Sequence, residues 1–383
     1  MFDVDFLSKT SKTKLQQIKL DHNKNLPLNI NLKKLLDQMM VSFSTDIDVS
    51  LNKYPNCQSL KNLFIKFNES YNGVSSSKFI ADVKQMESCY TAKLKVLNDI
   101  ITINFLVDKL SSSSGYIAST LHAIHTFCYT FPYHYHALVI NICLDDNKRD
   151  VDWSMNVPKV FDYLRMQSAA FNVSGVTDKK DKVINLTKKE EIIKLLYHEM
   201  VHFIGLDYEL INISINFGWA TKPAVLNISE AYTEFMSILL YAAYQSIHLA
   251  SLKKSNVYDT YARILFLETN YSVYLTSNIL KFFGYDENTF RDFFKGIGKK
   301  QQSPIYIWEY VIVRTQLLLN LDKVADLVGG NDEWRIDYSK VTAIVDLMKV
   351  NNEMINRIQY DMINTKPINN ISYTIIDLDW NKT

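Results

Sequence analysis

Apolar residues recur every three or four positions over most of this chain, a spacing that places them on one side of an α-helix. Near the N-terminus the pattern is clearest in LKKLLDQMMVSF, which begins at Leu32, and in KLKVLNDIITINFLVDKL, which begins at Lys93. A serine run and Gly115 interrupt it, and GYIASTLHAIHTFCYTF then continues as an apolar helical segment up to Pro132. We therefore predict that residues 1–130 form a helical region packed against the rest of the chain.

The pattern changes in YHYHALVINICLDD (133–146), which alternates at first, then runs apolar, and is rich enough in β-branched residues to be a strand. A helix is predicted next, over VPKVFDYLRM (157–166). AFNVSGVTDKKDKVINL follows and is predicted to be a β-hairpin, with its turn between Thr177 and Lys182 and with KVINL as the returning strand. This part of the chain is therefore expected to form a small β-sheet.

The most apolar helical stretch is EIIKLLYHEMVHFIGL, which contains HEMVH at residues 198–202. Thr187 and Glu190 fit the first and fourth positions of a capping box at its start, and Gly205 fits a helix C-cap. The helix has almost no polar face, so we expect it to be buried on nearly all sides.

A second apolar helix, SEAYTEFMSILLYAAYQSIHLASL, is predicted to begin after an irregular segment, with Asn227 or Ser229 as its N-cap. The segments beyond residue 255 again have helical spacing, and the tail after Pro367 has no clear assignment. Glycine (10) and proline (7) are scarce, which favours long helices over many short strands. The expected fold is mainly α, of the α+β class, with a core at residues 131–250 and a helical lobe at 251–383.

The two histidines of HEMVH, His198 and His202, lie about 6 Å apart along one face of a helix and can share one zinc ion. Glu199 lies about 100° round the helix from His198 and can reach a water molecule at the metal without being a ligand. Two imidazoles and a carboxylate in a buried helix are costly unless something satisfies them, and a metal with a bound water does so. We therefore predict a Zn²⁺ site.

A catalytic zinc ion usually has three protein ligands and one position for water, so HEMVH needs a partner. Glu230 is the best candidate because it lies at the start of the second apolar helix, in NISEAYTEF. Glu234 lies one turn further on the same face. This spacing suits one carboxylate that binds the metal and a second that holds a histidine N–H.

HEMVH followed by SEAYTE resembles the gluzincin metallopeptidases, in which HExxH is followed on a later helix by a Glu and, four residues on, by an acidic residue. The resemblance covers about residues 170–245. It implies a zincin-like catalytic core with KVINL as the edge strand and a cleft between two lobes, either in a thermolysin-like arrangement or in the helical bowl of the thimet-type oligopeptidases. It also implies that the substrate is a peptide or protein.

The mechanism that these assignments imply has zinc held by His198, His202 and Glu230, and has Glu199 as the general base for an activated water. The tetrahedral intermediate needs a further donor, usually a Tyr, His or Arg from the C-terminal lobe. SPIYIWEYVIVR offers three candidates for this role: Tyr306, Tyr310 and Arg314.

Two alternatives compete with this interpretation, and a pair of histidines elsewhere is a separate candidate for a second metal site. In the metzincins the pattern HExxHxxGxx is completed by His or Asp at the position of Tyr208, from which Asp207 is one residue out of register. A structural or interaction protein that keeps a zincin fold would use zinc only to brace two helices. His134 and His136 share a strand face and would suit a second metal site, although a histidine in the core or at its rim is the commoner outcome.

Charge and composition limit which partners and which cellular locations we expect. The formal net charge is +1 with no basic stripe, so nucleic acid is not an expected partner. The N-terminus lacks a signal-peptide pattern, and the apolar runs are shorter than the ~20 residues that span a bilayer. Four cysteines without CxxC pairs or disulfide-dense spacing favour a reducing location, cytoplasmic or otherwise intracellular, or a viral compartment. Nothing in the sequence indicates an oligomeric state.

Overall fold

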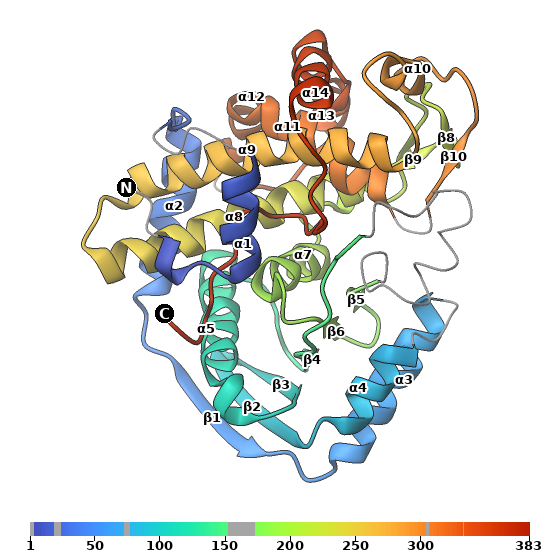
Figure 1. Ribbon diagram of the computed structural model, residues 1–383. Coiled ribbons are helices and arrows are strands. Elements are labelled where there is room, and N and C mark those ends of the chain that lie inside the picture. Colours follow the sequence, from blue (N-terminus) through green and yellow to red (C-terminus); the bar gives the residue numbers. More distant parts are fainter. Residues whose placement is uncertain (1–3, 19–23, 73–76, 152–172, 304–305, 332) are drawn as a thin grey trace.

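The structure is a computed structural model in which a mixed six-stranded sheet packs against a set of helices (Figure 1). This arrangement confirms the α+β class. The structure describes residues 4–18, 24–72, 77–151, 173–303, 306–331 and 333–383. The helix predicted at residues 157–166 lies outside the described residues.

The sheet has the strand order β1-β2-β3-β4-β6-β5, with β3, β4 and β6 parallel and the other neighbours antiparallel. The predicted hairpin is confirmed, because β5 and β6 pair directly, and β5 ends the sheet. The strands are β1 (Asp48–Lys53), β2 (Ser88–Val96), β3 (Asp99–Val107), β4 (Val139–Cys143), β5 (Gly175–Asp178) and β6 (Val183–Thr187).

The helix predicted from Lys93 is wrong, because this segment forms the hairpin of β2 and β3. Along β2, Leu94 and Val96 are buried while Lys93 and Lys95 are exposed, which is the alternation of a strand. The branched side chains of β3 favour the same structure. Residues 1–130, which we predicted to be helical, contribute β1, β2 and β3 to the sheet, and β3 pairs there with β4 from the next part of the chain.

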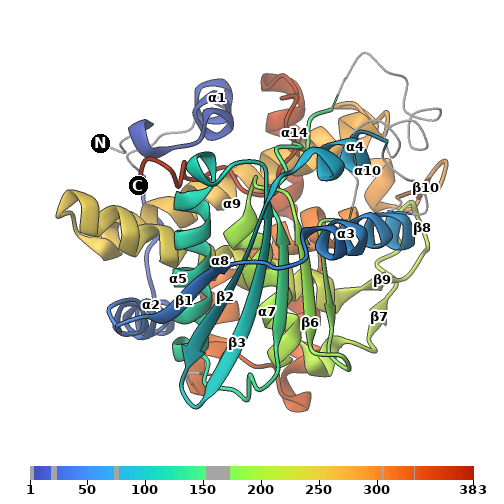
Figure 2. The same cartoon turned by 90° about the horizontal axis from the view of Figure 1, so that it is seen from below.

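Helices cover both faces of the sheet (Figure 2). Leu94 and Ile103 face the main core, which they share with α5, whereas Cys89 and Leu106 face the opposite side. The second side is covered by α3 and α4, which form a smaller apolar cluster with it. The helices of this half are α2 (Ile30–Phe43), α3 (Cys57–Asn72), α4 (Ser77–Gln85), α5 (Ser114–Thr130) and α7 (Ile192–Ile204).

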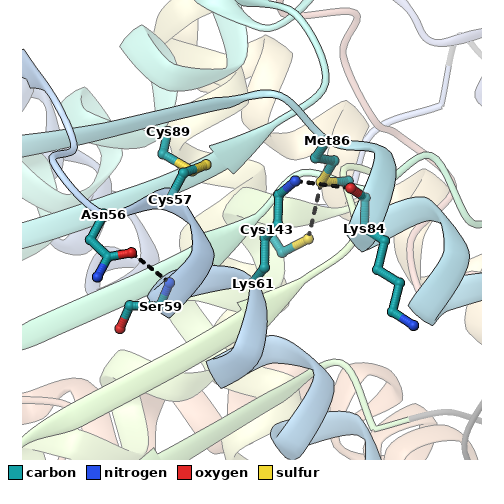
Figure 3. Close-up of a disulfide and its surroundings, with 8 residues drawn as sticks. All are labelled: Asn56, Cys57, Ser59, Lys61, Lys84, Met86, Cys89 and Cys143. Carbon is teal, nitrogen blue, oxygen red and sulfur yellow. Dashed lines mark hydrogen bonds between the residues drawn. A yellow bond between two sulfur atoms is a disulfide. The ribbon is translucent and has the colours of Figure 1, made fainter.

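A disulfide joins Cys57 at the start of α3 to Cys89 in β2, with 5.5 Å between their Cα atoms (Figure 3). The spacing of the cysteines did not indicate this pair, because residues that meet between a strand and the helix covering it can lie far apart in the sequence, here by 32 positions. The disulfide therefore weakens the sequence argument that the cysteine spacing favours a reducing location. Cys128 and Cys143 are buried thiols. The location of the protein stays a prediction.

Most of the chain after residue 255 is helical, in agreement with the spacing of its apolar residues. Two long helices, α8 and α9, cross the molecule beneath a group of shorter ones (Figure 1). The helices outside the sheet half are η1 (Val4–Phe6), α1 (Lys9–Ile18), α8 (Ile228–Lys253), α9 (Val257–Phe282), α10 (Phe290–Phe294), the π-helical η6 (Trp308–Val313), α11 (Arg314–Leu319), α12 (Leu321–Val328), α13 (Val341–Met348) and α14 (Asn352–Asn364). The short elements are η2 (Leu110–Ser112), η5 (Tyr208–Leu210), β7 (Ser214–Ile215), β8 (Thr221–Lys222), β9 (Leu226–Asn227), β10 (Gln301–Gln302), η7 (Gly329–Asn331) and η8 (Tyr338–Lys340).

Among the described residues, α8 is the one helix that is long and apolar enough to cross a membrane. Its most apolar stretch is 83% buried inside the molecule. The absence of a membrane span therefore stays a prediction.

The tail after α14, which the sequence left unassigned, is irregular, and its residues 370–378 are all buried. The amides of Ile375 and Ile376 donate to the carboxylate of Glu268 on α9, at 3.2 and 3.0 Å. The amide of Thr374 donates to Glu191, just before α7, at 2.6 Å. The tail therefore links α9 to the start of the helix that contains HEMVH.

Three histidines, His122, His125 and His248, are held between α2, α5, α8 and the C-terminal tail. Burial, with smaller effects from the other two histidines, lowers the pKa of His122 to about 4. Because the unfolded chain takes up a proton near pH 6.5 and the folded chain does not, stability is expected to fall as the pH drops from 6.5 towards 4, by about 2 kcal/mol at pH 5 from His122 alone. Urea unfolding of the wild type and of His122→Gln at pH 7 and pH 5 tests this. An equal loss of stability in both proteins would contradict it.

Candidate metal centre

The helix that contains HEMVH, α7, begins at Ile192 and ends before Gly205, whose φ of 70° confirms the predicted C-cap. The predicted capping box is wrong. Thr187 still belongs to β6, and its hydroxyl donates to the carbonyl of Ser174 at 3.3 Å. Glu191, in a left-handed conformation, separates the strand from the helix.

The second helix of the site, α8, begins at Ile228. Of the two predicted N-caps, Asn227 and Ser229, the structure has Asn227. Its side chain accepts a hydrogen bond from the amide of Ser229 at 3.1 Å. This start places Glu230 in the first turn, where α8 lies beside α7.

Three ligand atoms converge between these helices. Oε2 of Glu230 lies 3.5 Å from Nε2 of His198 and 3.5 Å from Nε2 of His202. All three atoms lie within 4.8 Å of one another, so one ion can contact all of them. In the part of the chain that the structure describes, this is the group of His, Cys, Asp and Glu side chains arranged to hold a metal. Two imidazole nitrogens and one carboxylate oxygen form a donor set typical of catalytic zinc.

The other nitrogen of each histidine ring is held by a carboxylate. Nδ1 of His198 lies 3.0 Å from Oε2 of Glu234, as the sequence predicted for Glu234. Nδ1 of His202 lies 2.8 Å from Oδ2 of Asp207, a role that sequence reasoning missed. A proton on each Nδ1 leaves Nε2 free to bind a metal. The only signal for Asp207 was its position just after the Gly205 cap, where the chain turns back towards His202.

The metzincin alternative requires a ligand at Tyr208, but this side chain is 64% exposed. Asp207 faces Nδ1 of His202, away from the three converging atoms. The geometry therefore favours Glu230 over both residues as the third ligand. His134 and His136 are exposed and belong to no metal-binding group among the described residues, so a second metal site gains no support.

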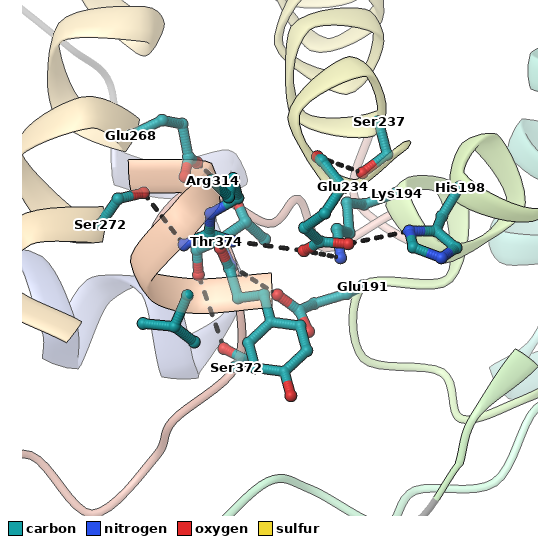
Figure 4. A network of polar contacts seen from close by, with 12 residues as sticks. Glu191, Lys194, His198, Glu234, Ser237, Glu268, Ser272, Arg314, Ser372 and Thr374 are labelled. Carbon is teal, nitrogen blue, oxygen red and sulfur yellow. Dashed lines mark hydrogen bonds and ion pairs between the residues drawn. The ribbon is translucent and has the colours of Figure 1, made fainter. Parts of the chain in front are cut away.

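Glu234 is the centre of a buried ionic network (Figure 4). Lys194 forms an ion pair with it, and Nη1 of Arg314 donates to Oε1 at 3.2 Å. Burial alone would raise the pKa of the Glu234 carboxyl, but Lys194, His198 and Arg314 hold it below its usual value. Glu234 is therefore a carboxylate when it orients His198.

Arg314 was predicted as a donor to the substrate, and the structure does not bring it into the pocket. Its side chain is fully buried behind Glu234. Besides Glu234, it donates to the carbonyl of Tyr373 and to Oγ of Ser272, both at 3.0 Å. Arg314 therefore lies where it can fix the position of the Glu234 carboxylate, and not where it could contact a substrate.

A pocket of about 680 Å³ lies over the three ligand atoms, between β5, α7, the start of α8 and η6. Two of the predicted donors line it. The hydroxyl of Tyr310 donates to Oε2 of Glu230 at 3.0 Å, and Tyr306 is 47% exposed beside it. The tail contributes Tyr373, whose ring centroid lies 5.7 Å from that of Tyr310. The pocket thus combines the three candidate ligand atoms with three tyrosines.

Glu199 lies in the same pocket and is held by the edge strand β5. Oγ1 of Thr177 donates to Oε2 of Glu199 at 2.8 Å and to its carbonyl at 3.0 Å. Burial raises the pKa of Glu199, although His198 and His202 act in the opposite direction. The edge strand is thus Gly175–Asp178 and not KVINL, which forms β6 in the interior of the sheet. Sequence reasoning missed Thr177 and Gly175 as residues of the site.

Gly175 faces Glu199 so closely that a Cβ atom would lie 2.5 Å from Oε1. Gly175→Ala is therefore expected to displace the Glu199 carboxylate and, in the zinc peptidase that the sequence predicts, to reduce hydrolysis about tenfold with zinc content unchanged. Turnover and bound zinc are measured together. Gly330→Ala is the matched control, because no atom lies within 4 Å of a Cβ there. Equal turnover in the two variants would show that the position of Glu199 does not matter.

Comparison with known proteins finds no matching family model and no matching solved structure. The chain is similar to the uncharacterized protein R210 of Acanthamoeba polyphaga mimivirus, with 41% identity over 386 residues that cover 99% of each chain. This protein therefore belongs to the same family as the mimivirus protein R210.

Proposed function

We propose that this protein is a zinc-dependent peptidase with a zincin-like core of the gluzincin type. The observation that supports it most strongly is the convergence of His198 Nε2, His202 Nε2 and Glu230 Oε2 at one point. A pocket large enough for a few residues of a peptide lies over that point.

The side chains present fit zinc. His198, His202 and Glu230 would hold the ion, and the carboxylates of Glu234 and Asp207 already fix both imidazole rings with Nε2 towards it. When bound, zinc supplies a Lewis acid that polarises a carbonyl group and makes water nucleophilic near neutral pH.

Glu199 is positioned to move the proton. It takes one proton from the attacking water as the oxygen bonds to the peptide carbon, and it passes that proton to the leaving nitrogen as the C–N bond breaks. The products are a carboxylic acid and an amine, so atoms and charge balance. Burial raises the pKa of Glu199 above its usual value, which makes the carboxylate a stronger base for this proton.

Tyr306 and Tyr310 are the donors available to the carbonyl oxygen as it becomes negative. Tyr310 is tied to Glu230 by its hydroxyl and therefore lies at the ligand atoms. Tyr306 is partly exposed on the pocket wall and is free of the Glu230 contact. A phenol aimed at the developing oxyanion stabilises it more than it stabilises the neutral substrate.

The strand β5 offers a binding edge for a peptide. It pairs with β6 on one side, and no other described strand pairs with its outer edge. Residues 173–179 line the pocket along this edge. An extended peptide can add to such an edge through main-chain hydrogen bonds, which would hold the scissile bond beside Glu199.

Zinc dependence tests the function. The purified protein is expected to contain one zinc ion per chain and to cleave members of a mixed peptide library, as followed by mass spectrometry. A chelator should abolish cleavage, and zinc should restore it. A protein with one bound zinc that cleaves no peptide would overturn the proposal and favour the alternative in which zinc only braces α7 and α8.

A further inference from the structure

The π-helical element η6 is attached to the start of α8 by two adjacent side chains. Oε1 of Glu309 accepts a hydrogen bond at 3.1 Å from the amide of Asn227, the N-cap of α8. The next residue, Tyr310, donates its hydroxyl proton to Oε2 of Glu230 at 3.0 Å. Glu309 is 3% exposed, so little water reaches its contact. The wide turn of a π-helix is common at functional sites, and here it brings Tyr310 to a candidate ligand atom.

Tyr310 contacts both helices that carry the candidate ligands. Its ring lies edge-on to that of His198 on α7, with 5.6 Å between the ring centroids, while its hydroxyl reaches Glu230 on α8. The rings of Tyr306 and Tyr373 pack against it as well, with centroids 6.0 and 5.7 Å away. Three neighbouring rings therefore restrict the rotation of Tyr310 away from Glu230.

The hydrogen bond to Glu230 uses the only proton that the hydroxyl of Tyr310 can donate. A carboxylate that binds a metal is ionised, and a hydrogen bond to an ionised acceptor is stronger than one to a neutral carbonyl group. Oε2 can accept this bond and still bind a metal, because each carboxylate oxygen has two lone pairs. While Tyr310 holds Glu230, its proton is therefore not available to a substrate.

Tyr306 lines the same pocket in a different state. Its side chain is 47% exposed, and its hydroxyl forms no hydrogen bond with any residue that the structure describes. Its ring packs edge-on against that of Tyr310, so the two phenols are neighbours on the pocket wall. A hydroxyl that is exposed and not already donating can bond to a substrate that enters the pocket.

We propose that Tyr310 holds Glu230 in place as the third zinc ligand, and that Tyr306 is the catalytic residue that donates to the oxyanion of the substrate. This inference rests on the proposed peptidase function and assigns different roles to the two tyrosines. Tyr310 is a positioning residue, because it acts on the metal through Glu230. The variants Tyr310→Phe and Tyr306→Phe each remove a hydroxyl and keep the ring, so they separate the two roles.

Metal binding tests the role of Tyr310 without any substrate. In a competitive titration, Tyr310→Phe is expected to bind zinc about tenfold more weakly or worse, because Glu230 loses the bond that orients it. The visible absorption spectrum of the Co²⁺-substituted protein should change for the same reason. Tyr306→Phe should match the wild type in both measurements, as should the control Tyr338→Phe, whose residue is 82% exposed on η8. Zinc binding by Tyr310→Phe as tight as that of the wild type would overturn the inference.

Turnover tests the role of Tyr306. On a peptide that the wild type cleaves, and at saturating zinc, Tyr306→Phe is expected to lower kcat about 10²-fold with little change in KM. Tyr310→Phe should regain most of its kcat as zinc is raised. An equal or larger loss of kcat in Tyr310→Phe at saturating zinc would overturn the inference and leave the peptidase function standing.

Two further results keep this inference separate from folding defects and from the proposed function. Circular dichroism shows whether each variant is folded, and the predictions for Tyr306→Phe stay decisive if Tyr310→Phe is not. If the wild type with one zinc ion per chain cleaves no peptide, the role of Tyr306 falls with the peptidase function. The zinc affinities and the cobalt spectra then still decide the role of Tyr310.

Discussion

Glu199→Gln is expected to lower the rate of peptide hydrolysis by about 10³-fold while the protein keeps its zinc and its stability. Glutamine has the shape of glutamate, and its amide oxygen can still accept the hydrogen bond from Thr177. It cannot take the proton of the attacking water. The measurements are kcat/KM on a cleaved peptide, zinc per chain by elemental analysis, and the thermal midpoint.

A substitution of the same kind elsewhere separates loss of the base from loss of one negative charge. Glu353 lies on α14, is 60% exposed in its side chain and, among the residues that the structure describes, forms an ion pair with Arg357 at 3.6 Å. Glu353→Gln should therefore leave turnover unchanged. If Glu199→Gln also turned over at the wild-type rate, the proton transfer assigned to Glu199 would be wrong, even with zinc in place.

The part of the site that could be predicted lies on two regular helices. Because residues four apart on a helix share a face, HEMVH and SEAYTE already imply which side chains can meet, and the structure brings Glu230 and Glu234 to the two histidines. The prediction needed only that the two helices pack together. Their apolar composition made that packing favourable.

The parts that escaped prediction depend on contacts between distant segments or on irregular backbone. Thr177 reaches Glu199 only because β5 ends the sheet next to α7. Asp207 reaches His202 through a tight turn after the helix. Tyr373 lies in a tail without regular structure, where no periodicity indicates which side chains point inward.

The prediction for the segment that forms β2 and β3 was wrong for a different reason. Some of the apolar residues in this segment are three or four positions apart, as in a helix, and we gave this spacing more weight than the alternation of every second residue that is typical of a strand. Lys93 and Lys95, which alternate with buried neighbours, carried the strand signal. Because we took residues 1–130 to be helical, we did not expect this region to share a sheet with β4.

Arg314→Met is expected to destabilise the protein by about 3–5 kcal/mol, because it removes one partner of a fully buried ion pair. Glu234 would keep Lys194, but the carbonyl of Tyr373 and the hydroxyl of Ser272 would lose a donor that no water can replace. Because Glu234 orients His198, zinc affinity should also fall, by about tenfold. Urea unfolding of the metal-free protein and a competitive zinc titration measure the two effects.

The pattern of losses distinguishes the two roles considered for Arg314. A residue that holds Glu234 affects stability and zinc affinity first, and turnover at saturating zinc should fall much less than in Glu199→Gln. A donor to the substrate would instead affect kcat with zinc affinity unchanged, and that result would contradict the buried position of the side chain. Arg357→Met is the control, since this arginine is partly exposed on α14, where it pairs with Glu353 and donates to Asn270, and its loss should leave zinc binding unchanged.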